Sequence, residues 1–193
     1  MVEEESYFLE LVRYRRKEEW TMSDLPYRVI PDAPPSFTAG AVLGRLADGI
    51  GFRYRWATEG LGDADLAFKP APDCMSLGEL LTHIHDLLRR VAEAAGVTAT
   101  ADFMRPGEGC AEVRDRTLLL AQEIGKRFKA AGEADLARWE IKTTAGETYP
   151  FWYAVNGPLA DSLTHIGQVN SWRRMAGKPV PRASLFKGLP PPQ

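Results

Sequence analysis

Long apolar runs are missing from this sequence. No stretch approaches the roughly 20 residues that span a bilayer, and the first twenty residues are charged throughout, unlike a signal peptide. Cysteine is scarce: Cys74 and Cys110 form neither a CxxC pair nor a metal-ligand spacing. Two scattered cysteines are typical of free thiols in a reducing compartment. We therefore expect a cytoplasmic protein that does not associate with membranes.

An excess of charge of either sign is also missing. The chain holds 24 Lys and Arg against 26 Asp and Glu, a formal net charge of −2. A nucleic-acid-binding protein usually shows a basic face, so nucleic acid is not an expected partner. The sequence contains no P-loop, no dinucleotide-binding glycine pattern, no Ser-His-Asp arrangement and no nucleophilic cysteine. These absences argue against nucleotide-dependent enzymes and metal-free hydrolases.

What is present is the composition of one ordinary globular domain, 45% hydrophobic and 26% charged. We predict three parts. Residues 1–35 form an N-terminal extension and a proline-punctuated lead-in; residues 3–20 could be a charged helix, and Met22 could be the natural start. Residues 36–178 form an all-α four-helix bundle. Residues 179–193 form an extended, proline-rich tail.

Four amphipathic segments support the bundle. They are predicted over residues 38–61, 76–95, 110–131 and 157–175. Ser76 and Glu79 make a capping box at the start of the second, and Gly177 with Pro179 ends the fourth. The predicted core stripes are Leu43, Leu46, Ile50, Tyr54, Ala57 and Leu61; Leu77, Leu80, Leu81, Ile84, Leu87, Leu88, Val91 and Ala95; Leu120, Ile124 and Phe128; and Leu159, Leu163, Ile166 and Val169.

Between the third and fourth helices the pattern becomes β-branched and aromatic. A short extended or hairpin insertion is therefore predicted near residues 138–149, with Ala145-Gly146 as its turn. The aromatic run that follows, Tyr149, Phe151, Trp152 and Tyr153, could wall a pocket, although packing in the core or a dimer is the favoured interpretation. Arg173 and Arg174 could pair with a substrate carboxylate, but a helix C-terminus favours cations for electrostatic reasons alone.

The stretch LADSLTHIGQVNSWRR carries the candidate site. Asp161, His165, Gln168 and Trp172 share one stripe beside the apolar face, and the first two are one helical turn apart, a spacing that lets two ligands hold one ion. By spacing alone, a solvated Asp/His pair on the helix surface is the favoured interpretation and a metal site the alternative.

On the second predicted helix, His83 and His85 border the apolar stripe from opposite sides. At most one of them can therefore join the pair on the last helix.

The segments MSLGELLTHI and DSLTHIGQVNSWRRMAG resemble the DinB/YfiT-like superfamily of bacterial four-helix bundles. The resemblance runs from the first predicted helix to Gly177-Lys178-Pro179. It implies His83 and His165 as metal ligands, and it places Asp161 where the family has a histidine. The expected site is thus His83, Asp161 and His165, with His85 as a reserve ligand and Glu79, Asp86, Gln168 and Trp172 as supporting or substrate-contacting candidates.

The resemblance also implies a chemistry. Family members include thiol-dependent transferases and metal-dependent hydrolases, in which a divalent ion holds a low-molecular-weight thiol or a water. Two histidines and one carboxylate suit Zn²⁺, Ni²⁺, Fe²⁺ or Mn²⁺ without choosing among them. We expect a metal-dependent enzyme acting on a small-molecule substrate, with homodimerisation implied. The alternative is a non-catalytic metal-binding or stress-associated dimer whose site has degraded at Asp161.

Overall fold

The computed structural model describes residues 25–192. Within this part four helices have sixteen or more residues: α2 (Ala39–Thr58), α3 (Leu77–Ala94), α4 (Cys110–Lys129) and α7 (Ala160–Met175). Shorter elements connect them, namely η1 (Asp63–Asp65), α5 (Glu133–Arg138), β1 (Glu140–Lys142), β2 (Thr148–Pro150), α6 (Trp152–Ala154) and η2 (Val155–Leu159). The chain is therefore mostly helical, as predicted. The predicted helix over 3–20 and Met22 lie outside the described residues.

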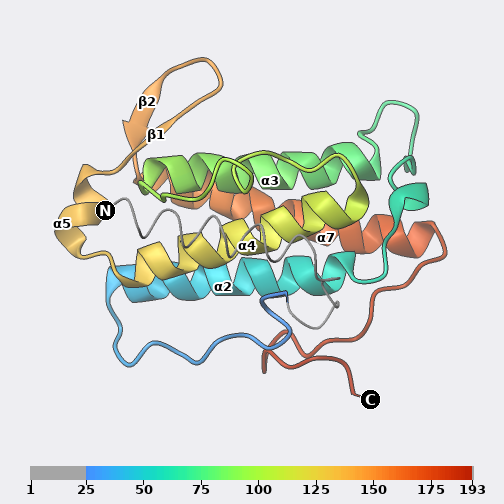
Figure 1. The fold of residues 1–193 in the computed structure, drawn as a ribbon, viewed down its shortest axis with the longest axis horizontal. Helices are drawn as coiled ribbons and strands as arrows, with labels where there is room; N and C mark the ends of the chain where they lie inside the picture. The colour runs from blue at the N-terminus through green and yellow to red at the C-terminus, as the bar shows by residue number, and fades with distance from the viewer. Residues whose placement is uncertain (1–24, 193) are drawn as a thin grey trace, which may run out of the picture.

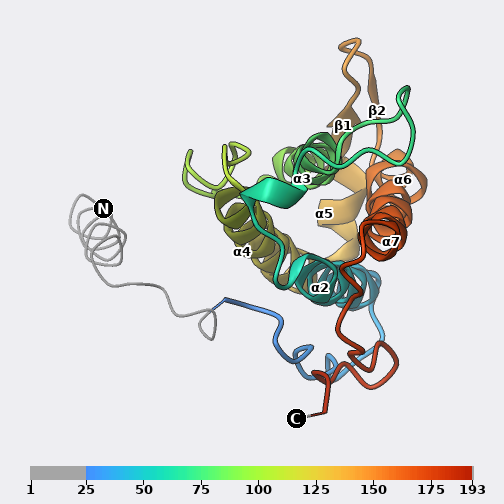
Figure 2. The same ribbon diagram turned by 90° about the vertical axis from the view of Figure 1, so that its right-hand side faces the viewer.

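The four long helices lie side by side, and each packs against two of the others (Figure 1). α2 contacts α4 and α7, and α3 contacts the same two helices, so the order seen end-on is α2-α4-α3-α7 (Figure 2). α2 and α7 run in one direction and α3 and α4 in the other (Figure 1). The connection between α3 and α4, which run the same way, therefore returns along the length of the molecule, whereas the connections after α2 and after α4 each join helices at one end (Figure 1).

The starts of α2 and α3 follow the predicted boundaries closely. Thr38 Oγ1 accepts a hydrogen bond from the Ala41 backbone N–H at 3.1 Å and starts α2. Ser76 Oγ accepts from the Glu79 N–H at 3.2 Å, and the Glu79 carboxylate accepts from the Ser76 N–H at 2.6 Å, which completes the predicted capping box. The small sheet is an antiparallel β1–β2 hairpin, and Gly146, with φ of +85°, lies in its turn.

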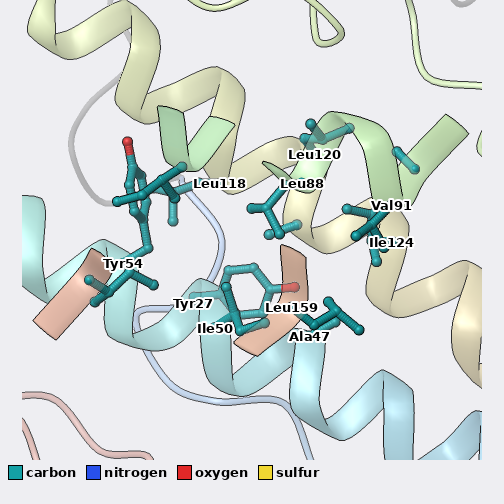
Figure 3. Close-up of a cluster of buried hydrophobic side chains, with 14 of the residues drawn as sticks. Tyr27, Ala47, Ile50, Tyr54, Leu88, Val91, Leu118, Leu120, Ile124 and Leu159 are labelled. Carbon is teal, nitrogen blue, oxygen red and sulfur yellow. The ribbon is translucent and has the colours of Figure 1, made fainter. Parts of the chain in front are cut away.

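The core lies between the four helices, and Figure 3 shows part of it. Every residue of the predicted α3 stripe is buried, as are Leu120, Ile124 and Phe128 of α4. The predicted stripe of α2 is only partly correct, because Leu43, Leu46 and Leu61 are half-buried. The small residues Gly40, Gly44 and Ala47 are buried instead. Added side chains at Gly40 and Gly44 would meet α4 and the turn after it, so this face allows the two helices to approach closely.

Two segments outside the helices cover α2. Leu25 and Tyr27 are buried although the lead-in has no regular structure, and Tyr27 adopts a φ of +69°. Its hydroxyl donates to Asp48 Oδ1 at 3.5 Å, and Lys129 pairs with Asp48 Oδ2 at 2.6 Å. The tail beyond α7 is non-helical, as predicted, and the Ile30 N–H donates to the Gly188 carbonyl at 2.9 Å. The lead-in and the tail are thereby joined.

Two buried arginines hold the C-terminal end of α2. Arg173 of α7 donates from Nη1 to the Ala57 carbonyl at 2.8 Å and from Nε to the Lys178 carbonyl at 3.1 Å. Arg114 of α4 donates to Thr58 Oγ1 at 3.0 Å and forms an ion pair with Glu59. The interpretation of Arg173 as a cation placed by the helix terminus alone is therefore incomplete, because its guanidinium is buried and joins three segments.

Neither cysteine forms a disulfide, as the sequence predicts. None of the helices in residues 25–192 combines the length and the apolar composition that crossing a bilayer requires.

Arg173→Ala should lower the free energy of unfolding by about 2–4 kcal/mol, because it removes two charge-assisted hydrogen bonds, one of them the buried bond to the Ala57 carbonyl. Arg174→Ala is the matched control. That side chain is exposed and donates only to the Asn170 carbonyl, so its loss should cost no more than about 0.5 kcal/mol. Urea unfolding of both variants measures the difference, and equal effects would show that the Arg173 contacts do not stabilise the fold.

Candidate metal centre

The candidate site lies where α3 and α7 pack against each other. α3 supplies His83, and α7 supplies Asp161 and His165 from two successive turns of one face. The structure brings these three residues, predicted from the sequence, into one cluster. His83 reaches it because the buried apolar stripe of α3 fixes the rotation of that helix.

The ligating atoms face one another. Asp161 Oδ1 lies 3.4 Å from His165 Nε2, and Asp161 Oδ2 lies 3.9 Å from His83 Nε2. The two imidazole rings are edge to face, with centroids 4.8 Å apart and an interplanar angle of 77°. One ligand atom from each residue lies within 4.8 Å of the other two. Ligands about 2.1 Å from a tetrahedral ion are about 3.4 Å apart, so small side-chain movements would close this cluster around an ion.

The three side chains are reached by solvent to different degrees. The imidazole of His165 is 13% exposed, that of His83 36% and the Asp161 carboxylate 45%. An ion held by these three groups would therefore have protein on one side and solvent on the other. Three protein ligands with an open side are the arrangement of catalytic rather than structural zinc sites, which have four protein ligands.

Gln168 is the predicted supporting residue that contacts a ligand. Its Oε1 lies 2.7 Å from His165 Nδ1. An amide oxygen only accepts hydrogen bonds, so Nδ1 carries the hydrogen and Nε2 of the neutral ring keeps its lone pair. That lone pair is on the nitrogen nearest Asp161. The contact thus sets the tautomer and orientation that a metal-ligating histidine needs.

The other predicted supporting residues have different contacts. Glu79 caps α3 and lies 3.8 Å from Lys69 Nζ, and Asp86 pairs with Arg89 at 3.3 Å. Both nevertheless line, together with His83, an open hollow of about 390 Å³ beside α3. Trp172 packs partly buried against the hydrophobic core. The first two thus border a space next to the cluster, whereas Trp172 belongs to the packing.

His85 does not join the cluster. It is fully buried on the α4 side of α3, with Nδ1 3.0 Å from Thr117 Oγ1. Burial lowers its pKa to about 4, which keeps the ring neutral near pH 7. Its proposed role as a reserve ligand is therefore not supported by its position.

The segment before α7 differs from the prediction. The fourth predicted helix was expected to start at residue 157, but helical turns already begin at Trp152 and pass through the wide turn of η2. α7 starts at Ala160 without a side-chain cap. Gly157, with φ of −90° and ψ of −112°, interrupts the helical backbone just before Pro158. The first turn of α7, which carries Asp161, follows directly after this kink.

The aromatic run after the hairpin divides into two parts. Phe151 is buried and packs edge to face against Phe128 and Trp139, at centroid distances of 5.7 and 5.1 Å. Tyr149 stacks on Tyr153 at 4.7 Å, and Trp152 is 80% exposed. Core packing is therefore the role of Phe151 and, in part, of Tyr149, whereas Trp152 is exposed.

A scan of the chain against protein-family models finds no match, and neither do searches of curated proteins and of solved structures. The geometry of the cluster is thus the main observation from which a function can be proposed.

Substituting His83 and His85 of α3 one at a time should show which histidine stabilises the core and which does not. In metal-free protein, His85→Ala should lower the free energy of unfolding by about 2–4 kcal/mol, because it leaves a cavity and removes the buried hydrogen bond between His85 and Thr117. His83→Ala should change it by no more than about 0.5 kcal/mol, because that ring is partly exposed. Denaturant unfolding in the presence of a chelator measures both, and a larger loss for His83→Ala would assign it to the core.

Proposed function

We propose that His83, Asp161 and His165 bind one divalent metal ion. The observation that carries this proposal is the convergence of three ligating side chains from two helices, with Gln168 orienting the least exposed of them. A solvated Asp/His pair within one helix, the interpretation that spacing alone favours, accounts for neither the third ligand nor the Gln168 contact. Two nitrogens and one carboxylate suit Zn²⁺, Ni²⁺, Fe²⁺ or Mn²⁺.

We also propose that the chain is a member of the DinB/YfiT-like superfamily and that its long helices form the four-helix bundle of that family. Four long helices, His83 near the start of α3 and His165 before Gly167-Gln168 support this assignment. Asp161 marks the departure from the family pattern. It faces both histidines, which supports a changed ligand set rather than a lost site.

The proposed activity is metal-dependent transfer or hydrolysis on a small molecule. A divalent ion at this cluster would lower the pKa of a coordinated thiol or water and make it a nucleophile at neutral pH. His83 and His165 would hold the ion through Nε2, and Gln168 would hold the His165 ring in place. The hollow lined by Glu79, His83 and Asp86 offers space beside the cluster for a substrate. A cytoplasmic location is part of the proposal, supported by the two free thiols.

The second candidate function is a non-catalytic, metal-binding dimer. The partial exposure of Trp152 and Tyr153 favours an interaction of this kind, and both functions would use the same ion. Metal binding and turnover must therefore be tested separately.

Metal titration of protein purified without an affinity tag tests the site itself. Wild type should bind one Zn²⁺ or Ni²⁺ per chain, and His83→Ala and His165→Ala should each weaken binding by more than about 100-fold. Asp161→His, which restores the family residue, should preserve binding. Gln168→Ala should weaken it by about tenfold, with Gln122→Ala on α4 as the matched control. Unchanged affinity in Asp161→Ala would remove Asp161 from the site, and unchanged affinity in His165→Ala would refute the site.

Turnover is tested with the metal-loaded chain, a low-molecular-weight thiol and an aryl halide electrophile, and in parallel with an activated ester in water. The enzyme proposal expects product formation that a chelator abolishes and that His165→Ala lacks. Full metal occupancy without metal-dependent product in either assay would instead support the non-catalytic dimer. Sedimentation analysis of the same sample then measures whether the chain dimerises.

A further inference from the structure

A second feature lies on the opposite side of α7, where α7 meets α2 and the C-terminal tail (Figure 2). Two open hollows, of about 500 and 430 Å³, lie there next to each other, since both are lined by Arg53, Leu163 and Leu185. We name them together the arginine groove. Its four cations are Arg45 and Arg53 of α2, Arg174 of α7 and Arg182 of the tail.

The charge of the arginine groove is not balanced by the protein. No Asp or Glu lines either hollow. In the part of the chain that the structure describes, the arginines that pair with carboxylates are Arg89, Arg114, Arg116 and Arg138, all outside the groove. Arg45 and Arg174 donate only to the backbone carbonyls of Pro31 and Asn170. Four cations in one concave seam favour an anion there.

Arg53 is the groove cation with the clearest need for an anionic partner. It is half-buried on α2 and is shared by both hollows. Within residues 25–192 it has no ion pair or hydrogen bond, whereas buried guanidinium groups elsewhere in this chain, such as Arg173, are hydrogen-bonded. A partly desolvated cation without a partner is unfavourable, and a bound anion would remove this cost.

The groove also contains a buried hydrogen-bond donor. Trp56 lines the first hollow, and its Nε1 is inaccessible to water and has no partner among the described residues. An anionic oxygen is an acceptor that would satisfy it. The Asn170 amide has an unpaired buried oxygen, and turning that amide would present donors as well.

The remaining lining is mostly apolar and comes from four segments, the lead-in, α2, α7 and the tail. Trp56, Leu163 and Ile166 line the groove from α2 and α7, and Leu185 and Phe186 line it from the tail. Phe186 is fully exposed and Leu185 is 46% exposed. An apolar chain lying in the groove would cover these side chains and gain hydrophobic burial. The combined volume is that of ordinary small-molecule sites.

We propose that the arginine groove binds a small amphipathic anion, a carboxylate or phosphate carried on an apolar chain. The surface of an anionic membrane presents the same chemistry. A free molecule is favoured because the cations line hollows between α2, α7 and the tail and not a flat face. This proposal does not depend on the metal site, because the groove uses the opposite side of α7.

Calorimetric titration of the full chain with decanoate, in the presence of a chelator, tests the proposal. Decanoate should bind one per chain, decyl phosphate should bind comparably, and uncharged decanol should bind at least about tenfold more weakly because it lacks the charge-assisted contacts. Equal binding of decanol and decanoate would overturn the proposal. So would co-sedimentation with phosphatidylglycerol vesicles without decanoate binding, which would assign the groove to a membrane surface.

Variants locate the binding. Arg53→Gln and, on the exposed tail, Arg182→Gln should each weaken decanoate binding by about tenfold. Arg182→Gln keeps the test valid if Arg53→Gln alters folding. Arg90→Gln, a half-buried arginine of α3 outside the groove, should stay within about twofold of wild type. His165→Ala should bind decanoate normally, so that failure of the metal site and failure of the groove are told apart. Unchanged affinity in both groove variants would refute the site.

Discussion

The burial of the apolar face of α3 is the constraint on which the rest of the structure depends. Seven apolar side chains of this helix, from Leu77 to Val91, are inaccessible or nearly so, and no other rotation of the helix would bury them. His83 and His85 lie on opposite sides of that face. The same packing therefore sends one imidazole to α7 and the other into the interface with α4. Hydrophobic burial, which has no direction of its own, here determines which histidine can meet an ion.

Much of the helical framework could be predicted because its signals are local. The Ser76–Glu79 capping box, the α3 stripe and the turn at Gly146 each lie within a few residues of sequence. The buried arginines could not be predicted in the same way, because Arg173 is fixed by carbonyls at Ala57 and Lys178. The close approach of α2 and α4 through small residues was missed for a related reason. A glycine carries no hydrophobic signal, although it decides how near two backbones come.

For the candidate site, sequence spacing identified Asp161 and His165, and the family resemblance selected His83. The choice between His83 and His85 was open from spacing alone, since both border the stripe. The structure resolves this choice, because His85 is buried in the core with its Nδ1 beside Thr117 Oγ1 of α4. The kink at Gly157 was not predicted, because a wide helical turn has no strong local signature. Its position matters because Asp161 lies in the turn that follows.

The order of the helices around the molecule has a consequence for how the chain acquires its cluster. His83 and the pair on α7 are separated in sequence by the whole of α4, the hairpin and the wide turn, and neither helix holds three ligands alone. The cluster exists only after the last long helix has docked against α3. An ion would thus bind only after α7 has docked. Its binding free energy would therefore add to the free energy of this last folding step.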